Sequence, residues 1–324
     1  MTTPMIDARN AKLWSVLGQR GTFAVTMLEL AKAHDNLMVV TADLGTLTGL
    51  DRFKNQWPAK FLNVGIAEQN MIGIAAGLAK EGHLVYATTY SNFLAMRSYE
   101  QIRLNLGYMR FPVHLVGTGA GIVMGFSGNS HYGLEDLALM RAVPGLTVLS
   151  PADGVETVKT LYAVKEYPHP TYIRLTGTLN NPAVYTQDYD FEIGRAVTLR
   201  EGTDVMIFAT GTMVHASLQA ANLLAERGVS AGVVDMHTIK PLDTQAVVAA
   251  CGKSKLIVTA EEHAMIGGLG GAVAEFKSTI GSPVKHLFIG LPDRFGKVAE
   301  YSFLLEKYGL TGSGIADRIT AALT

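Results

Sequence analysis

Short apolar runs alternate with longer stretches of helical periodicity, and this alternation constrains the fold of the chain more than any other feature. Residues 37–41, 84–88 and 113–117 have the apolar, β-branched composition of buried strands. Residues 22–34 and 92–106 carry apolar side chains at helical spacing. Repeated strand and helix units make strands parallel, because each helix returns the chain to the same sheet edge. The sequence therefore predicts an α/β fold, a doubly wound parallel sheet with helices on both faces.

The alternation starts again after a polar stretch, residues 179–190, that contains proline and has no clear period. Beyond it, residues 205–209 and 231–235 predict further strands separated by helical segments. Such a stretch is typical of an interdomain connection. We therefore expect two domains, residues 1–187 and a smaller α/β unit at residues 188–324.

Composition and charge exclude several kinds of partner. Hydrophobic residues make up 48% of the chain and charged residues 17%, so many side chains must be buried in a core and in subunit contacts. The formal net charge of −1 gives no electrostatic basis for binding nucleic acid or an anionic membrane. We expect neither as a partner.

The chain also carries no sign of secretion. The single cysteine, Cys251, has no second thiol for a disulfide or a zinc site. The first residues lack the layout of a signal peptide, and no apolar run approaches the ~20 residues of a membrane span. These features predict a soluble protein of the reducing cytoplasm.

A lone carboxylate, Glu68, stands in the otherwise apolar segment 61–79, where a strand is expected to lead into a helix. In an apolar pocket a carboxyl group tends to hold its proton, which suits a group that exchanges protons. An acid in the first turn of a helix is also stabilised by the helix dipole alone. The sequence leaves both interpretations of Glu68 open.

Two further segments carry candidate functional residues. Tyr90, Phe93 and Met96 are spaced three apart, so they would share one side of a helix or turn and could stack on a flat heteroaromatic ring. Such a stripe more often faces the protein core. His131 lies in a loop rich in Gly and Ser, where a histidine is either a proton shuttle or a structural or surface residue. Spacing alone does not separate these alternatives.

Glycine-rich stretches do not predict a nucleotide site. Gly117-Thr-Gly-Ala-Gly121 and Gly267-Gly-Leu-Gly-Gly271 lack the full G-x-G-x-x-G spacing of dinucleotide-binding loops. The sequence also contains no G-x-x-x-x-G-K-[ST] motif and no G-x-S-x-G motif. Phosphate-loop and serine-hydrolase functions are therefore not expected.

Several motifs, taken in order, resemble those of a known enzyme family. The pyrimidine-binding half of transketolase is similar to the segments Gly65-Ile-Ala-Glu-Gln-Asn, Tyr90-Ser-Asn-Phe, Ser127-Gly-Asn-Ser-His and Pro151-Ala-Asp-Gly. The C-terminal domain shared by transketolase, deoxyxylulose-phosphate synthase and 2-oxoacid dehydrogenase β subunits resembles residues 233–243 and 258–268. The resemblance covers nearly the whole chain. It implies a thiamine-diphosphate-binding pyrimidine-type sheet followed by a transketolase C-terminal domain.

The resemblance also implies a reaction, the transfer of a two-carbon ketol unit from a ketose to an aldose through thiamine diphosphate. Glu68 would hydrogen-bond N1′ of the aminopyrimidine and promote the tautomer that deprotonates the thiazolium C2. His131 would handle substrate hydroxyl protons, and Arg20 would contact the distal end of the substrate. The implied cofactor contacts are Asp43, Leu44, Glu68, Tyr90, Phe93 and Met96. The implied substrate contacts are Arg20, Ser127 and His131.

The diphosphate half of the family site is missing from the sequence. In the family, Gly-Asp-Gly followed about 25 residues later by Asn holds Mg²⁺, a hard cation that needs oxygen ligands. This chain contains no Gly-Asp-Gly. The resemblance therefore implies that the Mg²⁺ ligands and the diphosphate site lie on a separate N-terminal transketolase subunit, with self-association in an α₂β₂ assembly.

Three positions depart from the transketolase pattern. Gly119 stands where a histidine is usual, Ser127 stands where an aspartate reads the C2 hydroxyl, and Gly177 stands where an arginine grips a sugar phosphate. These departures predict a substrate whose terminal phosphate is altered or absent. Arg174 either compensates for the missing arginine or faces away from the site.

Other functions stay open on the sequence alone. The β subunit of a 2-oxoacid dehydrogenase has a similar length and an equivalent glutamate, although Glu68-Gln-Asn and the Gly128-Asn-Ser-His loop argue against it. Half of a deoxyxylulose-phosphate synthase is a further alternative. A noncatalytic assembly subunit is the alternative from a different class, and retention of Glu68 with the aromatic segment argues against it.

Overall fold

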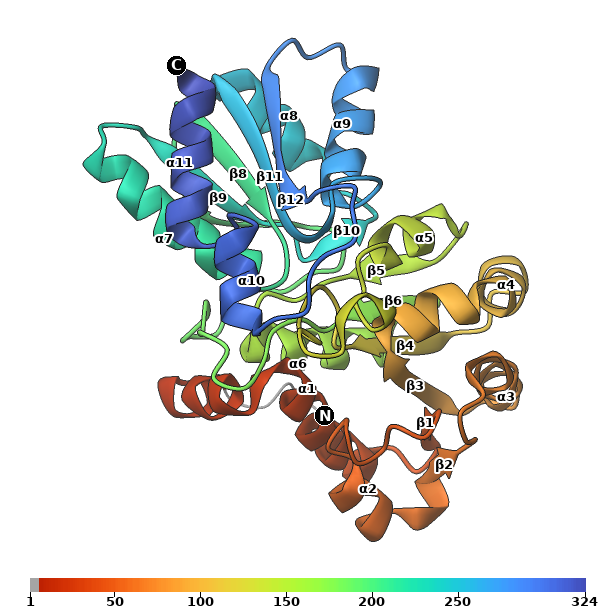
Figure 1. Ribbon diagram of the computed structural model, residues 1–324. Helices are drawn as coiled ribbons and strands as arrows, with labels where there is room; N and C mark the ends of the chain where they lie inside the picture. The colour runs from red at the N-terminus through yellow and green to blue at the C-terminus, as the bar shows by residue number, and fades with distance from the viewer. Residues whose placement is uncertain (1–5) are drawn as a thin grey trace.

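The protein is described by a computed structural model that covers residues 6–324. Two α/β halves lie one above the other in Figure 1, the N-terminal half in red to yellow-green and the C-terminal half in green to blue. This arrangement confirms the expected α/β class and the second α/β unit. The N-terminal five residues, on which the signal-peptide expectation partly rests, lie outside the described residues.

The sheet of the N-terminal half has the strand order β10-β5-β6-β4-β3-β1-β2. Its strands are β1 (Leu37–Thr41), β2 (Phe61–Asn63), β3 (Leu84–Tyr90), β4 (Val113–Thr118), β5 (Thr147–Leu149), β6 (Thr171–Arg174) and β10 (Thr238–Lys240). Strands β1 to β6 pair in parallel, as the alternation predicts. Strand β10 comes from the C-terminal half and pairs antiparallel with β5. The sequence did not predict this crossing, because a strand of that length has almost no pattern of its own.

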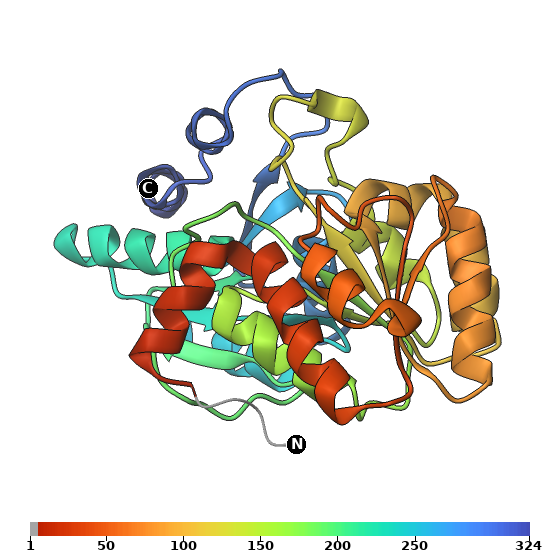
Figure 2. The ribbon, with the colours of Figure 1, turned by 90° about the horizontal axis from the view of Figure 1, so that it is seen from below.

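Helices cover both faces of this sheet, as expected (Figure 2). They are α1 (Ala8–Ala33), α2 (Asp51–Gln56), α3 (Glu68–Lys80), α4 (Tyr99–Ile102), α5 (Asp136–Ala142) and α6 (Gly154–Val164). Shorter turns of helix are η1 (Pro58–Lys60), η2 (Phe93–Arg97), η3 (Arg103–Tyr108) and η4 (Gly128–Ser130). Successive residues of β1 belong to different hydrophobic clusters: Val39 lies in the cluster that includes residues of α1 and α6, and Val40 lies in the cluster that includes residues of α3. Both strand faces are buried, which is why the strands have continuous apolar sequences.

Helix α1 begins at Ala8, well before the expected start at residue 22. The Asp7 side chain accepts a hydrogen bond from the Asn10 backbone N–H at 2.8 Å and so caps the helix. Gly18 then kinks α1 with a φ of 64°, and a Cβ there would collide with the Thr178 carbonyl group. The kink interrupts the helical period, so the sequence pattern indicated only the later part of the helix.

The C-terminal half is built on a second sheet with the strand order β12-β11-β8-β9-β7. Its strands are β7 (Val197–Arg200), β8 (Val205–Ala209), β9 (Ala231–Asp235), β11 (Leu256–Ala264) and β12 (Lys285–Leu291). Its helices are α7 (Met213–Glu226), α8 (Thr244–Lys253), α9 (Leu269–Thr279), α10 (Tyr301–Lys307) and α11 (Gly312–Leu323). The expected domain boundary at 187/188 falls in the described segment 175–196, which contains no helix or strand. The boundary itself stays a prediction.

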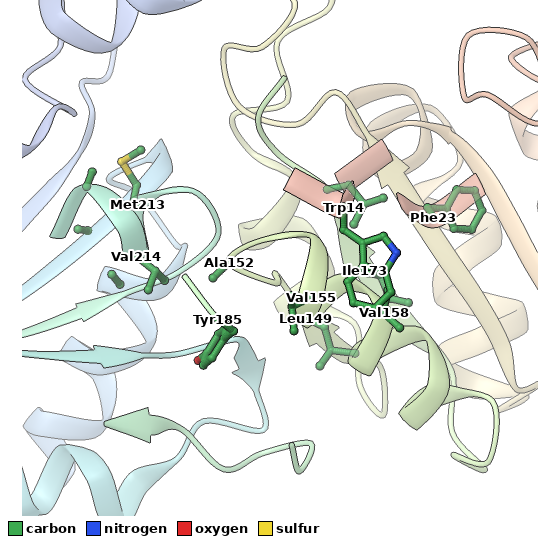
Figure 3. Close-up of a cluster of buried hydrophobic side chains, with 14 of the residues drawn as sticks. Trp14, Phe23, Leu149, Ala152, Val155, Val158, Ile173, Tyr185, Met213 and Val214 are labelled. Carbon is green, nitrogen blue, oxygen red and sulfur yellow. The ribbon is translucent and has the colours of Figure 1, made fainter. Parts of the chain in front are cut away.

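Hydrophobic clusters span the two halves, and part of one of them is drawn in Figure 3. Val155 of α6 lies in the same cluster as Met213 and Val214 of α7. Tyr185, from the segment that connects the halves, is buried between them. Burial of this apolar surface holds the halves in a fixed relation.

Buried carboxyl groups line the same junction. Glu156 on α6 and Asp235 at the end of β9 are both fully buried. The Tyr185 hydroxyl donates to Asp235 Oδ2 at 2.8 Å, and the Tyr189 hydroxyl donates to Glu156 Oε1 at 2.7 Å. Burial raises the pKa of Asp235 and of Glu156, because water no longer stabilises the charged form. At a pH between the unfolded and folded pKa values, Asp235 and Glu156 therefore hold protons that the same groups would release in an unfolded chain.

Asp235→Asn should flatten the pH dependence of stability. Folding raises the pKa of Asp235 from near 4 in the unfolded chain to about 7. Its contribution to the free energy of unfolding is therefore fully present below about pH 4 and is lost as the pH rises through the folded pKa. Wild type should therefore lose about 1.4 kcal/mol relative to Asp235→Asn for each pH unit between those two values. Urea unfolding between pH 5 and 8 measures this. Asp190→Asn, an exposed change nearby, is the control, and parallel slopes for wild type and Asp235→Asn would contradict the assignment.

Candidate active site

Glu68 is the first residue of α3, just beyond the carboxyl end of β2, and its side chain is 3% exposed. Arg97 Nη1 donates to both carboxylate oxygens, at 2.8 Å each. The residue before it, Ala67, offers no capping side chain. The helix-start interpretation of its position is confirmed. The carboxylate is nonetheless paired with Arg97 of the neighbouring segment η2. An acid that only stabilises a helix start does not need such a partner.

The aromatic segment does not form the single stripe that its spacing suggested. Tyr90 is the last residue of β3 and is buried, whereas Phe93 opens η2 and is half-buried. The chain turns from strand to helix between them, and their ring centroids lie 6.0 Å apart. Phe93 and Met96 line a cavity of about 580 Å³. The core-facing alternative is therefore right for Tyr90 and wrong for Phe93 and Met96.

His131 comes to the same place from a distant loop. It follows η4, and its ring centroid lies 5.3 Å from that of Phe93 and 6.0 Å from that of Tyr90. Its Nδ1 is 3.0 Å from Ser130 Oγ. The fold thus gathers Glu68, the aromatic pair and His131 at the carboxyl ends of the parallel strands, where α/β proteins place their ligands.

The C-terminal half holds the His131 loop in place. Asn129 and Gly296 exchange hydrogen bonds, each at 2.8 Å, and the Tyr132 hydroxyl donates to the Lys297 carbonyl oxygen at 2.9 Å. These partners are far apart in sequence, and the motif analysis did not identify them. The second domain therefore orients a residue of the first.

The remaining candidate residues lie around this centre. Arg20 on α1 lines a second cavity, of about 240 Å³, together with Gly119 and Gly177. Asp43 and Leu44 follow β1, and the Asp43 N–H donates to Asn63 Oδ1 at 2.9 Å. The exposed Ser127 precedes η4. The cofactor and substrate contacts of these residues stay predictions.

The backbone explains two departures from the transketolase pattern. Gly119 has a φ of 63° and Gly177 a φ of 75°, a region that residues with a side chain rarely adopt. A Cβ on Gly177 would lie 2.8 Å from Thr212 Cγ2, and a Cβ on Gly119 would lie 3.3 Å from the Tyr90 ring. The cavity beside Arg20 is therefore built around the absence of these side chains.

Arg174 does not replace the missing arginine. It is 1% exposed, and its Nε donates to Asp136 Oδ2 at 2.8 Å. Its Nη2 donates to the carbonyl oxygens of Gly133 and Glu262, at 2.9 Å each. Of the two alternatives, the one in which Arg174 faces away from the site holds.

Sequence analysis missed Arg97. Its guanidinium carbon lies 4.3 Å from the Phe93 ring centroid while Nη1 pairs with Glu68. Arg97 stands four residues after Phe93, a helical spacing that could have indicated the contact with the ring. Nothing in the local sequence indicates the contact with Glu68.

Two structural observations bear on membranes and metals. Within residues 6–324, no helix is long and apolar enough to cross a membrane. Over the same range, no group of three or more His, Cys, Asp or Glu side chains is arranged to hold a metal ion.

Comparison with known proteins identifies the family. The family model for the transketolase pyrimidine-binding domain matches residues 18–181, and the model for the transketolase C-terminal domain matches residues 194–315. The chain belongs to the transketolase family. Its relatives include separate subunits as well as long chains, and it aligns with the subunit type almost from end to end.

One relative is described as a transketolase C-terminal section from Methanocaldococcus jannaschii. It is 42% identical over 305 residues, which cover 93% of this chain and 95% of that protein. A 6-deoxy-6-sulfo-D-fructose transketolase subunit from a Clostridium species is 39% identical over 298 residues, 91% of each chain. A solved split-gene transketolase, described as an inactive β₄ tetramer, is 39% identical with a TM-score of 0.85 and covers 94% of this chain and 98% of that chain. The transketolase interpretation of the sequence is thereby confirmed.

The family implies dependence on thiamine diphosphate, and the residues present fit its aminopyrimidine. The buried carboxylate of Glu68 and the Phe93 ring are both in contact with the same side chain, Arg97. The planar guanidinium group of Arg97 already meets both at once, stacked on the ring and donating to the carboxylate. A planar heteroaromatic ring with N–H donors suits the same two surfaces.

Proposed function

We propose that this chain is the pyrimidine-binding subunit of a split transketolase that moves a two-carbon ketol unit from a ketose to an aldehyde acceptor. The observation that carries the proposal is the buried Glu68 carboxylate, which Arg97 links to the Phe93 ring, with the His131 ring centroid 5.3 Å from that ring. Bound thiamine diphosphate would supply the carbon nucleophile. The protein residues would then bind, orient and exchange protons.

Each residue has a distinct role in this proposal. Glu68 exchanges a proton with N1′ of the aminopyrimidine, and its burial favours that exchange over exchange with water. Phe93 stacks on the aminopyrimidine ring of the cofactor, and Tyr90 packs against Phe93. Because Ser130 Oγ lies beside His131 Nδ1, we assign Nε2 of His131 to the substrate hydroxyl group. Asp43, Leu44 and Met96 complete the cofactor contacts.

A separate subunit would bind the diphosphate and Mg²⁺, which gives an α₂β₂ assembly in the cytoplasm. The absence of a Gly-Asp-Gly motif from the sequence supports this division. The split-gene relative described as an inactive β₄ tetramer supports it as well, because that subunit type associates with itself and lacks activity. The low fraction of charged residues fits such an interface.

The substrate would carry an altered terminal group. Gly119 and Gly177 leave the distal cavity with Arg20 as its cation, since their backbone conformation disfavours larger side chains. A relative is named for 6-deoxy-6-sulfo-D-fructose, a ketose with a sulfo group at its far end. We therefore propose that Arg20 pairs with a distal anionic or hydroxyl group other than the usual pentose phosphate, and that Ser127 reads the C2 region.

Co-expression with a partner tests the proposal. The partner should be a transketolase-like chain that carries Gly-Asp-Gly, and the complex should be assayed with thiamine diphosphate, Mg²⁺ and a panel of phosphorylated, sulfonated and unmodified ketoses. We expect ketol transfer by the complex and none by this chain alone. Transfer by the purified single chain would contradict the split site. Turnover of a 2-oxoacid with an artificial electron acceptor, without ketol transfer, would instead support the dehydrogenase alternative.

A further inference from the structure

Arg97 occupies the surfaces that the proposed function assigns to the cofactor. Its Nη1 donates to both oxygens of Glu68, so the carboxylate has its partner within the chain. Its guanidinium carbon lies 4.3 Å from the Phe93 ring centroid, so the ring face is covered as well. In the proposed function the aminopyrimidine takes one of those oxygens, and we assign it the Phe93 face on which Arg97 lies. Arg97 and the cofactor ring therefore cannot hold both contacts at the same time.

The guanidinium group has the chemistry of a stand-in. It is planar, it presents N–H donors to a carboxylate, and it stacks on aromatic faces. An aminopyrimidine is also planar, donates N–H groups and stacks. The same carboxylate and ring can therefore satisfy either group.

The subunit gains from having its own partner for Glu68. That side chain is 3% exposed, and a buried carboxylate without a partner is strongly destabilising. Since the proposed site is complete only when the partner subunit and the cofactor are bound, Glu68 of the free subunit needs another hydrogen-bond donor until then. Arg97 supplies it.

We propose that Arg97 is an internal placeholder for the aminopyrimidine, seated on Glu68 and Phe93 in the cofactor-free protein and displaced when thiamine diphosphate binds. This inference rests on the proposed function. It assigns to Arg97 a role in cofactor loading that is separate from the chemistry of transfer.

Arg97 is free to leave and Glu68 is not. The Arg97 side chain is 45% exposed, whereas the Glu68 side chain is enclosed. The cavity of about 580 Å³ lies directly beside Arg97 and is also lined by the exposed carboxylate of Glu135. The cavity thus offers the displaced guanidinium group both room and an acceptor. Because the Arg97 side chain is half-exposed, its guanidinium group returns to water when the pair breaks, while the cofactor takes its place on Glu68.

The affinity for thiamine diphosphate gives the test. In the complex with the diphosphate-binding subunit, Arg97→Met removes the competitor, so the dissociation constant of thiamine diphosphate with Mg²⁺ should fall, by up to roughly fivefold for a half-exposed ion pair. Arg97→Lys should lie between, because lysine can pair with Glu68 but cannot stack as a plane. Isothermal titration calorimetry measures these constants. Arg103→Met, at the exposed first residue of η3, is the matched control and should leave the constant unchanged.

A double mutant separates competition from other effects. In a Glu68→Gln background, Arg97→Met should raise cofactor affinity by less than it does in wild type, because the ion pair is already gone and only the contact with the Phe93 ring still competes. Thermal unfolding of the free subunit should show the converse: Arg97→Met lowers the midpoint by a few degrees, at least about 2 °C. Adding Glu68→Gln should restore most of that loss.

Different failures have different meanings. If the Arg97→Met complex binds the cofactor more weakly than the wild-type complex, or equally well, the proposed placeholder role of Arg97 is wrong and the proposed function stands. If the wild-type complex does not bind thiamine diphosphate at all, the proposed function is wrong and the placeholder falls with it. An unchanged melting midpoint in Arg97→Met would also overturn the placeholder, since the ion pair would then not stabilise the free subunit.

Discussion

Glu68→Gln should lower kcat for ketol transfer by about 10²–10⁴-fold, the range that general acid–base groups contribute. Glutamine keeps the shape of the glutamate side chain, which matters because residue 68 as a whole is only 2% exposed. Its amide can hydrogen-bond N1′ but cannot exchange a proton with it. The loss should therefore appear in kcat at saturating cofactor rather than in the KM for the ketose.

The measurement is a steady-state assay of the complex with thiamine diphosphate and Mg²⁺. Glu81→Gln, at the other end of α3 and exposed, is the matched control and should keep wild-type kcat. Circular dichroism checks that the fold is intact. A Glu68→Gln complex with full activity would contradict a catalytic role and favour the noncatalytic assembly subunit.

Arg174→Met should destabilise the protein by about 3–5 kcal/mol, the cost of removing one partner from a buried ion pair. Both side chains of the pair are inaccessible, at 1% for Arg174 and 0% for Asp136. The substitution would leave Asp136 with only the Tyr172 hydroxyl group as a donor to Oδ2, at 2.6 Å. It would also remove the hydrogen bonds from Arg174 to the carbonyl oxygens of Gly133 and Glu262. Together these two bonds join the N-terminal half to the C-terminal half.

Urea unfolding at pH 7 measures this effect. Arg227→Met is the control, because Arg227 pairs with Asp317 at the surface, with side chains 38% and 67% exposed. It should cost less than about 1 kcal/mol. Adding Asp136→Asn to Arg174→Met should recover part of the loss, since the uncompensated buried charge is then gone. A loss near that of the control would show that the buried pair is not a major contributor.

The parallel sheets follow directly from the sequence. Residues 205–209 and 231–235 were predicted as strands and are strands with those same bounds, since each has both faces buried and therefore a continuous apolar run. Strands β6 and β12 were not identified from their sequences, and β10 was assigned to neither sheet. β6 is only Thr171–Arg174 and ends in a charged residue, and β12 begins with Lys285 and His286, so neither has the continuous apolar run by which the other strands were predicted.

In the candidate site, too, some features were predicted from the sequence and others were not. Glu68, Tyr90, Phe93 and His131 were identified by residue type and order, and the structure brings them together. Which way Phe93 faces was not determined by spacing, because the chain changes from strand to helix between Tyr90 and Phe93. The direction of Arg174 was likewise open until its partners were known.

The sequence by itself determined the class of fold, the family, the lone acid Glu68 and the absence of the Gly-Asp-Gly motif, because these depend on short patterns and on which residues are present. Only the tertiary structure decided that Arg97 pairs with Glu68, and that the C-terminal half holds the His131 loop. The physical reason is distance along the chain: these contacts join residues that only the packing of both sheets brings within hydrogen-bond range.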